Sequence, residues 1–114
     1  MKHEVQKISK IVDEIINFYF INSSKKMNIV IEEKDDSYII IAESSQVECS
    51  AEKIEHIKKL LSVQRQSEMD EYYWQLAGED IKGGEFNLVG MMVDEVSIDF
   101  KPPSIRIELV RYKE

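Results

Sequence analysis

Few side chains in this sequence could serve as nucleophiles, bases or metal ligands. Cys49 and His56 would form a thiol nucleophile with its base only if the fold brought them together, and their spacing gives no sign of that. Neither His3 nor His56 stands at a metal-ligand spacing from Cys49 or from the other histidine. The chain also lacks a serine nucleophile elbow, a phosphate-binding P-loop and a paired-cysteine zinc pattern. The short motifs of common enzymes therefore indicate no activity.

The composition is that of a folded, acidic protein with a single domain over residues 1–114. It is 43% hydrophobic, and 22 acidic residues against 15 basic ones give a net charge of -7. That charge repels phosphate backbones and argues against nucleic-acid binding. The longest purely apolar run, Tyr38–Ala42, is far shorter than a membrane helix, and Met1–Lys10 has no apolar signal-peptide core. With one cysteine, Cys49, we expect a cytoplasmic protein that binds neither membrane nor nucleic acid.

The spacing of apolar residues predicts a helix and then a β-hairpin in the first half of the chain. A helix over residues 3–22 would bury one face, whose apolar residues recur at three- and four-residue spacing: Val5, Ile8, Val12, Ile15, Ile16 and Tyr19. Over Met27–Glu33, the period then changes to two, which predicts a strand: Met27, Ile29 and Ile31 alternate with Asn28, Val30 and Glu32. After a polar turn, Tyr38–Ala42 is apolar on both faces, which predicts a central strand.

The second half is predicted to contain three helices and a second hairpin. Ser50 is a suitable N-cap for a helix over residues 51–64, and Gly78 is a suitable end for an aromatic helix over Glu68–Ala77. A short apolar helix and two alternating strands follow, over Phe86–Val93, Val96–Phe100 and Ile105–Leu109. Two hairpins separated by helices predict an α+β fold, a two-layer α/β sandwich. We expect a mixed, mostly antiparallel four-stranded sheet with helices on one face and water on the other.

This order of elements resembles the nucleotide-binding core of the GHKL superfamily, which includes histidine kinases, gyrase and anti-sigma serine kinases. The stretch Asn87-Leu88-Val89-Gly90-Met91-Met92-Val93-Asp94-Glu95-Val96-Ser97-Ile98-Asp99-Phe100 is similar to the closing helix and strand of the anti-sigma serine kinases. In those proteins the helix ends in an acidic pair, and a strand of the Val-Ser-Ile type follows. The resemblance implies a histidine kinase-like ATPase fold over nearly the whole chain, with ATP and Mg²⁺ as the family's cofactors.

The resemblance gives a role to Asp13 and Asn17, which lie four residues apart and so on one side of a helix. In the family, an acidic residue and an asparagine at this spacing hold the magnesium ion on the phosphates. Carboxylate and amide oxygens are the hard ligands that Mg²⁺ prefers, and Asn17 is the implied metal ligand. Ile21 stands where the kinases have a histidine. The alternative is that Asp13 and Asn17 are ordinary solvated positions.

The other two family motifs are less well kept. The Asp that accepts the adenine amino group is replaced by Glu43, and no glycine occurs before Gly78 to let the backbone approach a ring. The family's phosphate-binding loop has the pattern Gly-x-Gly, and Gly83 matches its first glycine, with Gly84 after it. Glu85 stands where the second glycine should be and would repel phosphates. Glu43 could equally be a charged strand end, and Gly83-Gly84 a plain hinge. Taken together, these departures imply that nucleotide binding is lost or weakened.

The aromatic run Tyr72-Tyr73-Trp74 falls in the segment that forms the mobile lid over the nucleotide in the family. Three consecutive aromatic residues cannot all face one side of a helix, so at least one is expected at the surface. Exposed Tyr and Trp side chains are typical anchors of protein interfaces, and ordinary core packing is the alternative. We therefore name Tyr72, Tyr73 and Trp74 as candidate interaction residues.

These observations favour a non-catalytic regulatory or protein-interaction domain, because anti-sigma kinases act by binding partner proteins. The acidic chain would suit a partner with a basic face, and a homodimer is left open. The alternative is an ATP-binding serine kinase of the anti-sigma type with a variant pocket, in which Asp13 would be the general base. A third hypothesis is an unrelated α+β fold with a structural or oligomeric role.

Overall fold

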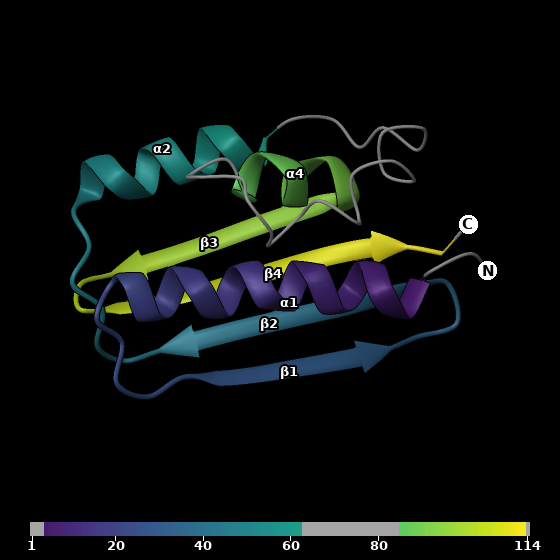
Figure 1. The fold of residues 1–114 in the computed structure, drawn as a ribbon, viewed down its shortest axis with the longest axis horizontal. Coiled ribbons are helices and arrows are strands. Elements are labelled where there is room, and N and C mark those ends of the chain that lie inside the picture. The colour runs from purple at the N-terminus through teal and green to yellow at the C-terminus, as the bar shows by residue number, and fades with distance from the viewer. Residues whose placement is uncertain (1–3, 63–84, 114) are drawn as a thin grey trace.

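The computed structural model describes residues 4–62 and 85–113, which form two layers (Figure 1). One layer is a four-stranded sheet with the strand order β1-β2-β4-β3, and the helices lie together on one face of it. In chain order the elements are α1 (Glu4–Ile21), β1 (Asn28–Glu33), β2 (Ser37–Ser44), α2 (Ala51–Leu61), α4 (Glu85–Met92), β3 (Glu95–Lys101) and β4 (Ser104–Tyr112). The predicted α+β sandwich with helices on one face is confirmed for these residues.

The two predicted hairpins are present and lie side by side. β1 pairs with β2, β3 pairs with β4, and the hairpins join through β2 and β4. All three pairings are antiparallel, so the predicted mixture of parallel and antiparallel pairs is wrong for the described strands. The predicted helix over Glu68–Ala77 lies outside the described residues. Within the described part of the chain, no helix is both long and apolar enough to span a membrane.

The core lies between the sheet and the helices, because alternate residues of each central strand point to the helical layer. Ile40 of β2 and Ile107 and Leu109 of β4 are at most 1% exposed. They pack in one cluster with residues of α1 and α4 such as Ile11 and Val89. On the other face of the sheet, the residues are half-buried or exposed except for Ser37 at the start of β2, and no described helix covers them, so this face is called the open face.

Helix α1 is rotated relative to its predicted apolar stripe. Val5 was expected on the buried face, but it is 72% exposed. The buried face instead follows Ile8, Ile11 and Ile15, and it includes three charged residues: Glu4, Lys7 and Glu14. The prediction was wrong at Val5 because it counted apolar residues only, whereas α1 also turns a charged side chain towards β4.

The predicted N-cap of the second helix is confirmed, but α2 ends at Leu61, with Ser62 as its C-cap, and not at residue 64 as predicted. The Ser50 hydroxyl accepts a hydrogen bond from the backbone N–H of Lys53 at 3.1 Å, which caps α2. At the end of α1, Ser23 has a φ of 62°, and the N–H of Ser24 bonds to the carbonyl of Tyr19 at 2.9 Å. A residue in the left-handed region closes the helix in the way a C′ residue commonly does. This turn leads the chain directly into β1.

Tyr19 ties α1 to the central strand β2. Its ring is fully buried, and its hydroxyl donates a hydrogen bond to the carbonyl oxygen of Ala42 at 2.8 Å. Burial raises the pKa of the Tyr19 phenol, and the negative charge of Glu43 raises it further. The phenol therefore keeps its proton in the folded protein at a pH at which it would lose the proton in the unfolded chain.

We expect this residue to make the protein less stable in alkali. Above about pH 10 the unfolded chain binds fewer protons at Tyr19 than the folded one, so stability falls by up to about 1.4 kcal/mol per pH unit from this group. Tyr19→Phe should cost about 1 kcal/mol at pH 7, because one hydrogen bond is lost. Urea unfolding at pH 7 and pH 11 checks this: the deficit of the variant should shrink at pH 11, and an equal deficit at both pH values would contradict it.

Candidate functional site

Asp13 and Asn17 are both exposed on the side of α1 that faces away from the sheet, as their spacing predicts. One turn beyond them, Phe20 is 66% exposed and Ile21 is 73% exposed. The four residues lie at three- and four-residue spacing and so form one patch, called here the α1 surface. The patch combines one carboxylate, one amide and two large apolar side chains.

Glu43 lies on the opposite face of the sheet from the α1 surface. It stands in β2 between Asn28 of β1 and Arg106 of β4, and it is exposed. Its neighbour Ala42 is fully buried under the helices, and successive side chains of a strand point to opposite faces. Glu43 therefore belongs to the open face, and it does not share a pocket with Asp13 and Asn17.

A hollow of about 410 Å³ lies around Glu43 on the open face. Its lining contains three basic residues (Lys26, Lys101 and Arg106), two acidic ones (Glu43 and Asp99), and also Asn28, Ser44, Ser45, Ser104 and Ile105. Arg106 is engaged with Glu108, its Nη1 lying 3.0 Å from Oε1 of that carboxylate. Because both signs of charge line the hollow, it has no clear preference for a phosphate or for a cation.

The remaining sequence candidates fall outside the described residues. They are Gly83 and Gly84 of the predicted glycine loop and the aromatic run Tyr72, Tyr73 and Trp74, and their roles stay predictions. Among the residues that are described, no group of three or more His, Cys, Asp or Glu side chains is arranged to hold a metal ion.

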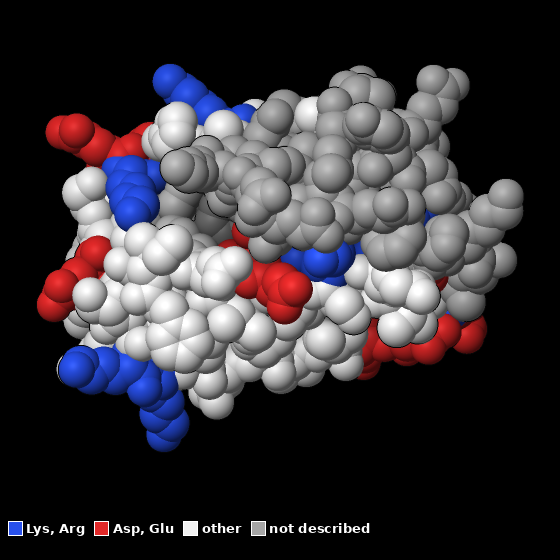
Figure 2. Space-filling view, viewed as in Figure 1, with Lys and Arg blue, Asp and Glu red and all other residues white. Residues whose placement is uncertain are grey.

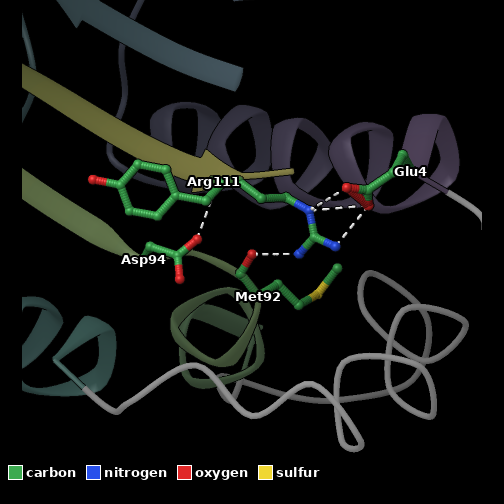
Figure 3. Close-up of polar contacts among 5 residues, drawn as sticks. Glu4, Met92, Asp94 and Arg111 are labelled. Carbon is green, nitrogen blue, oxygen red and sulfur yellow. Dashed lines mark hydrogen bonds and ion pairs between the residues drawn. The ribbon is translucent and has the colours of Figure 1, made fainter. Parts of the chain in front are cut away.

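Sequence reasoning missed a buried ion pair that joins both ends of the chain (Figure 3). Arg111 of β4 is fully buried, and its Nη2 lies 2.6 Å from Oε2 of Glu4 at the start of α1. Its Nε also bonds to both carboxylate oxygens, at 3.3 and 3.2 Å. Its Nη1 donates to the carbonyl of Met92, the last residue of α4, at 2.6 Å. One guanidinium thus holds a strand and two helices together.

A signal for this pair was present in the alternation of β4. Ile105, Ile107 and Leu109 point to the core, and Arg111 is the next residue with the same parity. A charged residue in such a position is buried only if a partner is buried with it. The partner is 107 residues away in the sequence, however, and periodicity cannot identify it.

The acidic pair Asp94-Glu95, which helped to suggest the family resemblance, has a structural role here. Oδ2 of Asp94 accepts a hydrogen bond from the backbone N–H of Tyr112 at 2.7 Å, and the N–H of Asp94 donates to the carbonyl of Val110 at 2.7 Å. The Tyr112 hydroxyl donates to the carboxylate of Glu95, and this hydrogen bond raises the pKa of the phenol. The pair therefore fastens the start of β3 to the end of β4.

Cys49 is half-buried, and its Sγ donates a weak hydrogen bond to the carbonyl of Ser50 at 3.8 Å. Burial raises the pKa of the thiol, which keeps it protonated and a poor nucleophile at neutral pH. His56 is exposed on α2. Nothing in this geometry favours a Cys49–His56 nucleophile pair.

Comparison of the chain with protein-family models, with curated proteins and with solved structures gave no match.

Proposed function

We propose that this chain is a non-catalytic regulatory domain that binds a partner protein, built on a histidine kinase-like ATPase fold whose ATP binding is lost or weakened. The observation that carries the proposal is the exposure of Phe20 and Ile21 beside Asp13 and Asn17. Large apolar side chains that cluster at the surface commonly mark a contact with another protein.

The order of elements supports the proposed fold family. A long first helix, a hairpin, further helices and a closing hairpin all fit the GHKL core, and the helices gather on one face of the sheet (Figure 1). The helix–acidic pair–strand passage at the end of α4 and the start of β3 also fits, because Asp94 and Glu95 hold it in place. The family assignment itself still rests on the resemblance.

The position of Glu43 supports the loss of nucleotide binding. An adenine-binding carboxylate would have to share a pocket with the magnesium-binding pair, yet Glu43 is on the open face and Asp13 and Asn17 are on the helical side. The chain also has no glycine before Gly78, so no backbone near β2 can take the close approach that a bound ring requires. We infer that ATP would make too few contacts for tight binding.

The chemistry of the α1 surface indicates the kind of partner. Figure 2 shows charged atoms over the middle of α1 but a largely uncharged surface over its C-terminal half, so an apolar patch on the partner would fit there. Asp13 at the border of Phe20 and Ile21, together with the net charge of -7, favours a basic rim around that patch. We place the interaction in the cytoplasm, where a free thiol such as Cys49 stays reduced.

Two matched variants test the α1 surface. The immobilised full chain is used to capture proteins from an extract of cells that produce it, and the captured proteins are identified by mass spectrometry. Phe20→Ser combined with Ile21→Ser should lose the captured partner, because the two large exposed apolar side chains of the α1 surface are removed. Val5→Ser is the control, since Val5 is 72% exposed on the same helix but about 22 Å away at 1.5 Å per residue. If the double variant captures the same proteins as the control, the α1 surface is not the interface.

A nucleotide-binding serine kinase is the alternative, and the exposure of Asp13 and Asn17 favours it. Both side chains are open to a ligand, and an acidic residue beside a magnesium site could act as the general base. This alternative requires a nucleotide affinity that the proposed regulatory domain would not have.

A further inference from the structure

Strand β1 is an edge of the sheet with exposed apolar side chains. Among the described strands it pairs only with β2, in the order β1-β2-β4-β3, and Val30 and Ile31 in its middle are 52% and 51% exposed. The other edge, β3, instead exposes polar residues: Glu95, Ser97, Asp99 and Lys101. Edge strands have unpaired N–H and C=O groups that invite another strand, and natural proteins usually blunt them with central charges. β1 has no charge at its centre.

The charges of β1 lie at its two ends and have opposite signs. Lys25 and Lys26 precede the strand, separated from its first residue Asn28 by Met27, and Glu32 and Glu33 finish it; all four charged residues are exposed. Figure 2 shows basic atoms at the end of this edge where β1 begins and acidic atoms where it ends. The segment Lys25-Lys26-Met27-Asn28-Ile29-Val30-Ile31-Glu32-Glu33 therefore has a basic start, an apolar middle and an acidic end.

Such a segment is complementary to a second copy of itself in the antiparallel direction. If Ile29 lies opposite Ile29 of the second copy, Lys26 of each copy lies opposite Glu32 of the other. Lys25 of each copy then lies opposite Glu33 of the other. In the same register Met27 lies opposite Ile31, so apolar side chains also meet. Directly opposite residues of antiparallel strands are neighbours on one face, where opposite charges and apolar pairs stabilise the pairing.

The charges select this register over the others. Pairing centred on Val30 would place Lys26 opposite Lys34, and pairing centred on Asn28 would place Lys26 opposite Val30. Parallel pairing in register would set Lys26 against Lys26 and Glu32 against Glu32. Like charges directly opposite each other destabilise a strand pair. In the registers that lie between these, the pairing is shifted by one residue, and the side chains that should meet then lie on opposite faces of the sheet.

We propose that two copies of this chain associate through antiparallel pairing of their β1 strands, centred on Ile29, which makes one continuous sheet across the dimer. The inner pair, Lys26 with Glu32 of the second copy, fixes the register. The outer pair, Lys25 with Glu33 of the second copy, stabilises the dimer less, because Glu33 already accepts a hydrogen bond from Lys113 of its own chain at 2.7 Å. This surface lies on β1 and is independent of the partner surface proposed on α1.

Charge-reversal variants of the full chain test the pairing by analytical ultracentrifugation from about 1 µM to about 1 mM, a range that covers the weak affinities of small interfaces. Lys26→Glu alone and Glu32→Lys alone should each self-associate at least tenfold more weakly than the unmodified chain, because each puts like charges opposite each other. An equimolar mixture of the two variants should associate like the unmodified chain, because both inner pairs are then restored. Circular dichroism shows whether each variant is folded.

Cross-linking locates the contact. A zero-length carbodiimide should join Lys26 to Glu32, and mass spectrometry identifies the linked peptides. Within one strand these residues are about 20 Å apart, at about 3.3 Å per residue, so such a link must join two chains. The proposal is overturned if the unmodified chain stays monomeric over the whole range. It is also overturned if the single variants associate as well as the unmodified chain, or if the mixture does not associate.

Discussion

Arg111→Met is expected to lower the free energy of unfolding by about 3–5 kcal/mol, because it leaves the Glu4 carboxylate buried without its cation. Glu4 is 4% exposed, and the lost guanidinium also held the carbonyl of Met92 (Figure 3). Domains of this size are stable by about 5–15 kcal/mol, so the variant should be only marginally folded. Urea unfolding followed by circular dichroism should show a midpoint lower by about 1.5–3 M.

Two further variants separate the buried pair from an ordinary arginine contact. Arg106→Met removes the ion pair between Arg106, whose side chain is 40% exposed, and Glu108. This variant should lower the free energy of unfolding by less than about 1 kcal/mol. Glu4→Leu combined with Arg111→Met removes both buried charges, and it should recover most of the stability that Arg111→Met alone loses. An Arg111→Met midpoint equal to that of Arg106→Met would show that the buried pair does not hold the two layers together.

Ile107→Ala is expected to cost about 2–5 kcal/mol, the usual range for truncating a large apolar side chain in a core. Ile107 is fully buried in the central strand β4, where it lies between Ala42 of β2 and Ile98 of β3. The cavity would open at the centre of the sheet, where neighbouring strands cannot move to close it. Calorimetry should show a melting temperature lower by roughly 10–20 °C.

Val5→Ala is the control, because it truncates an apolar side chain that is 72% exposed on α1 and lies in neither proposed interface. Surface substitutions usually change stability by about 0.5 kcal/mol or less, so its melting temperature should stay within a few degrees of that of the unmodified chain. Equal losses from the two variants would mean that the core is not centred on β4.

The fold could be predicted from the sequence largely because its signals are local. The alternation in Ile105, Ile107 and Leu109 needs only the pleat of a strand, and the Ser50 cap needs only the next turn of α2. The rotation of α1 could not be predicted in the same way. It depends on a contact between Glu4 and Arg111, which are almost the full chain length apart.

The candidate site was predicted less completely. The exposure of Asp13 and Asn17 followed from their spacing on α1, and the structure has both at the surface. The face of Glu43 could have been predicted as well, because it has the opposite parity to Tyr38, Ile40 and Ala42, which are buried under the helices. The family motif, however, was assigned by chain order alone, and chain order does not say which face of a sheet a residue occupies.

Isothermal titration with Mg-ATP and Mg-ADP tests the central claim most directly, since the claim is that the scaffold has lost tight nucleotide binding. With Asp13 and Asn17 on one side of the sheet and Glu43 on the other, we expect no saturable heat up to about 1 mM nucleotide, which corresponds to binding weaker than about -4 kcal/mol. A saturable isotherm with a micromolar dissociation constant that is lost in Asn17→Ala would contradict the claim and favour the serine kinase.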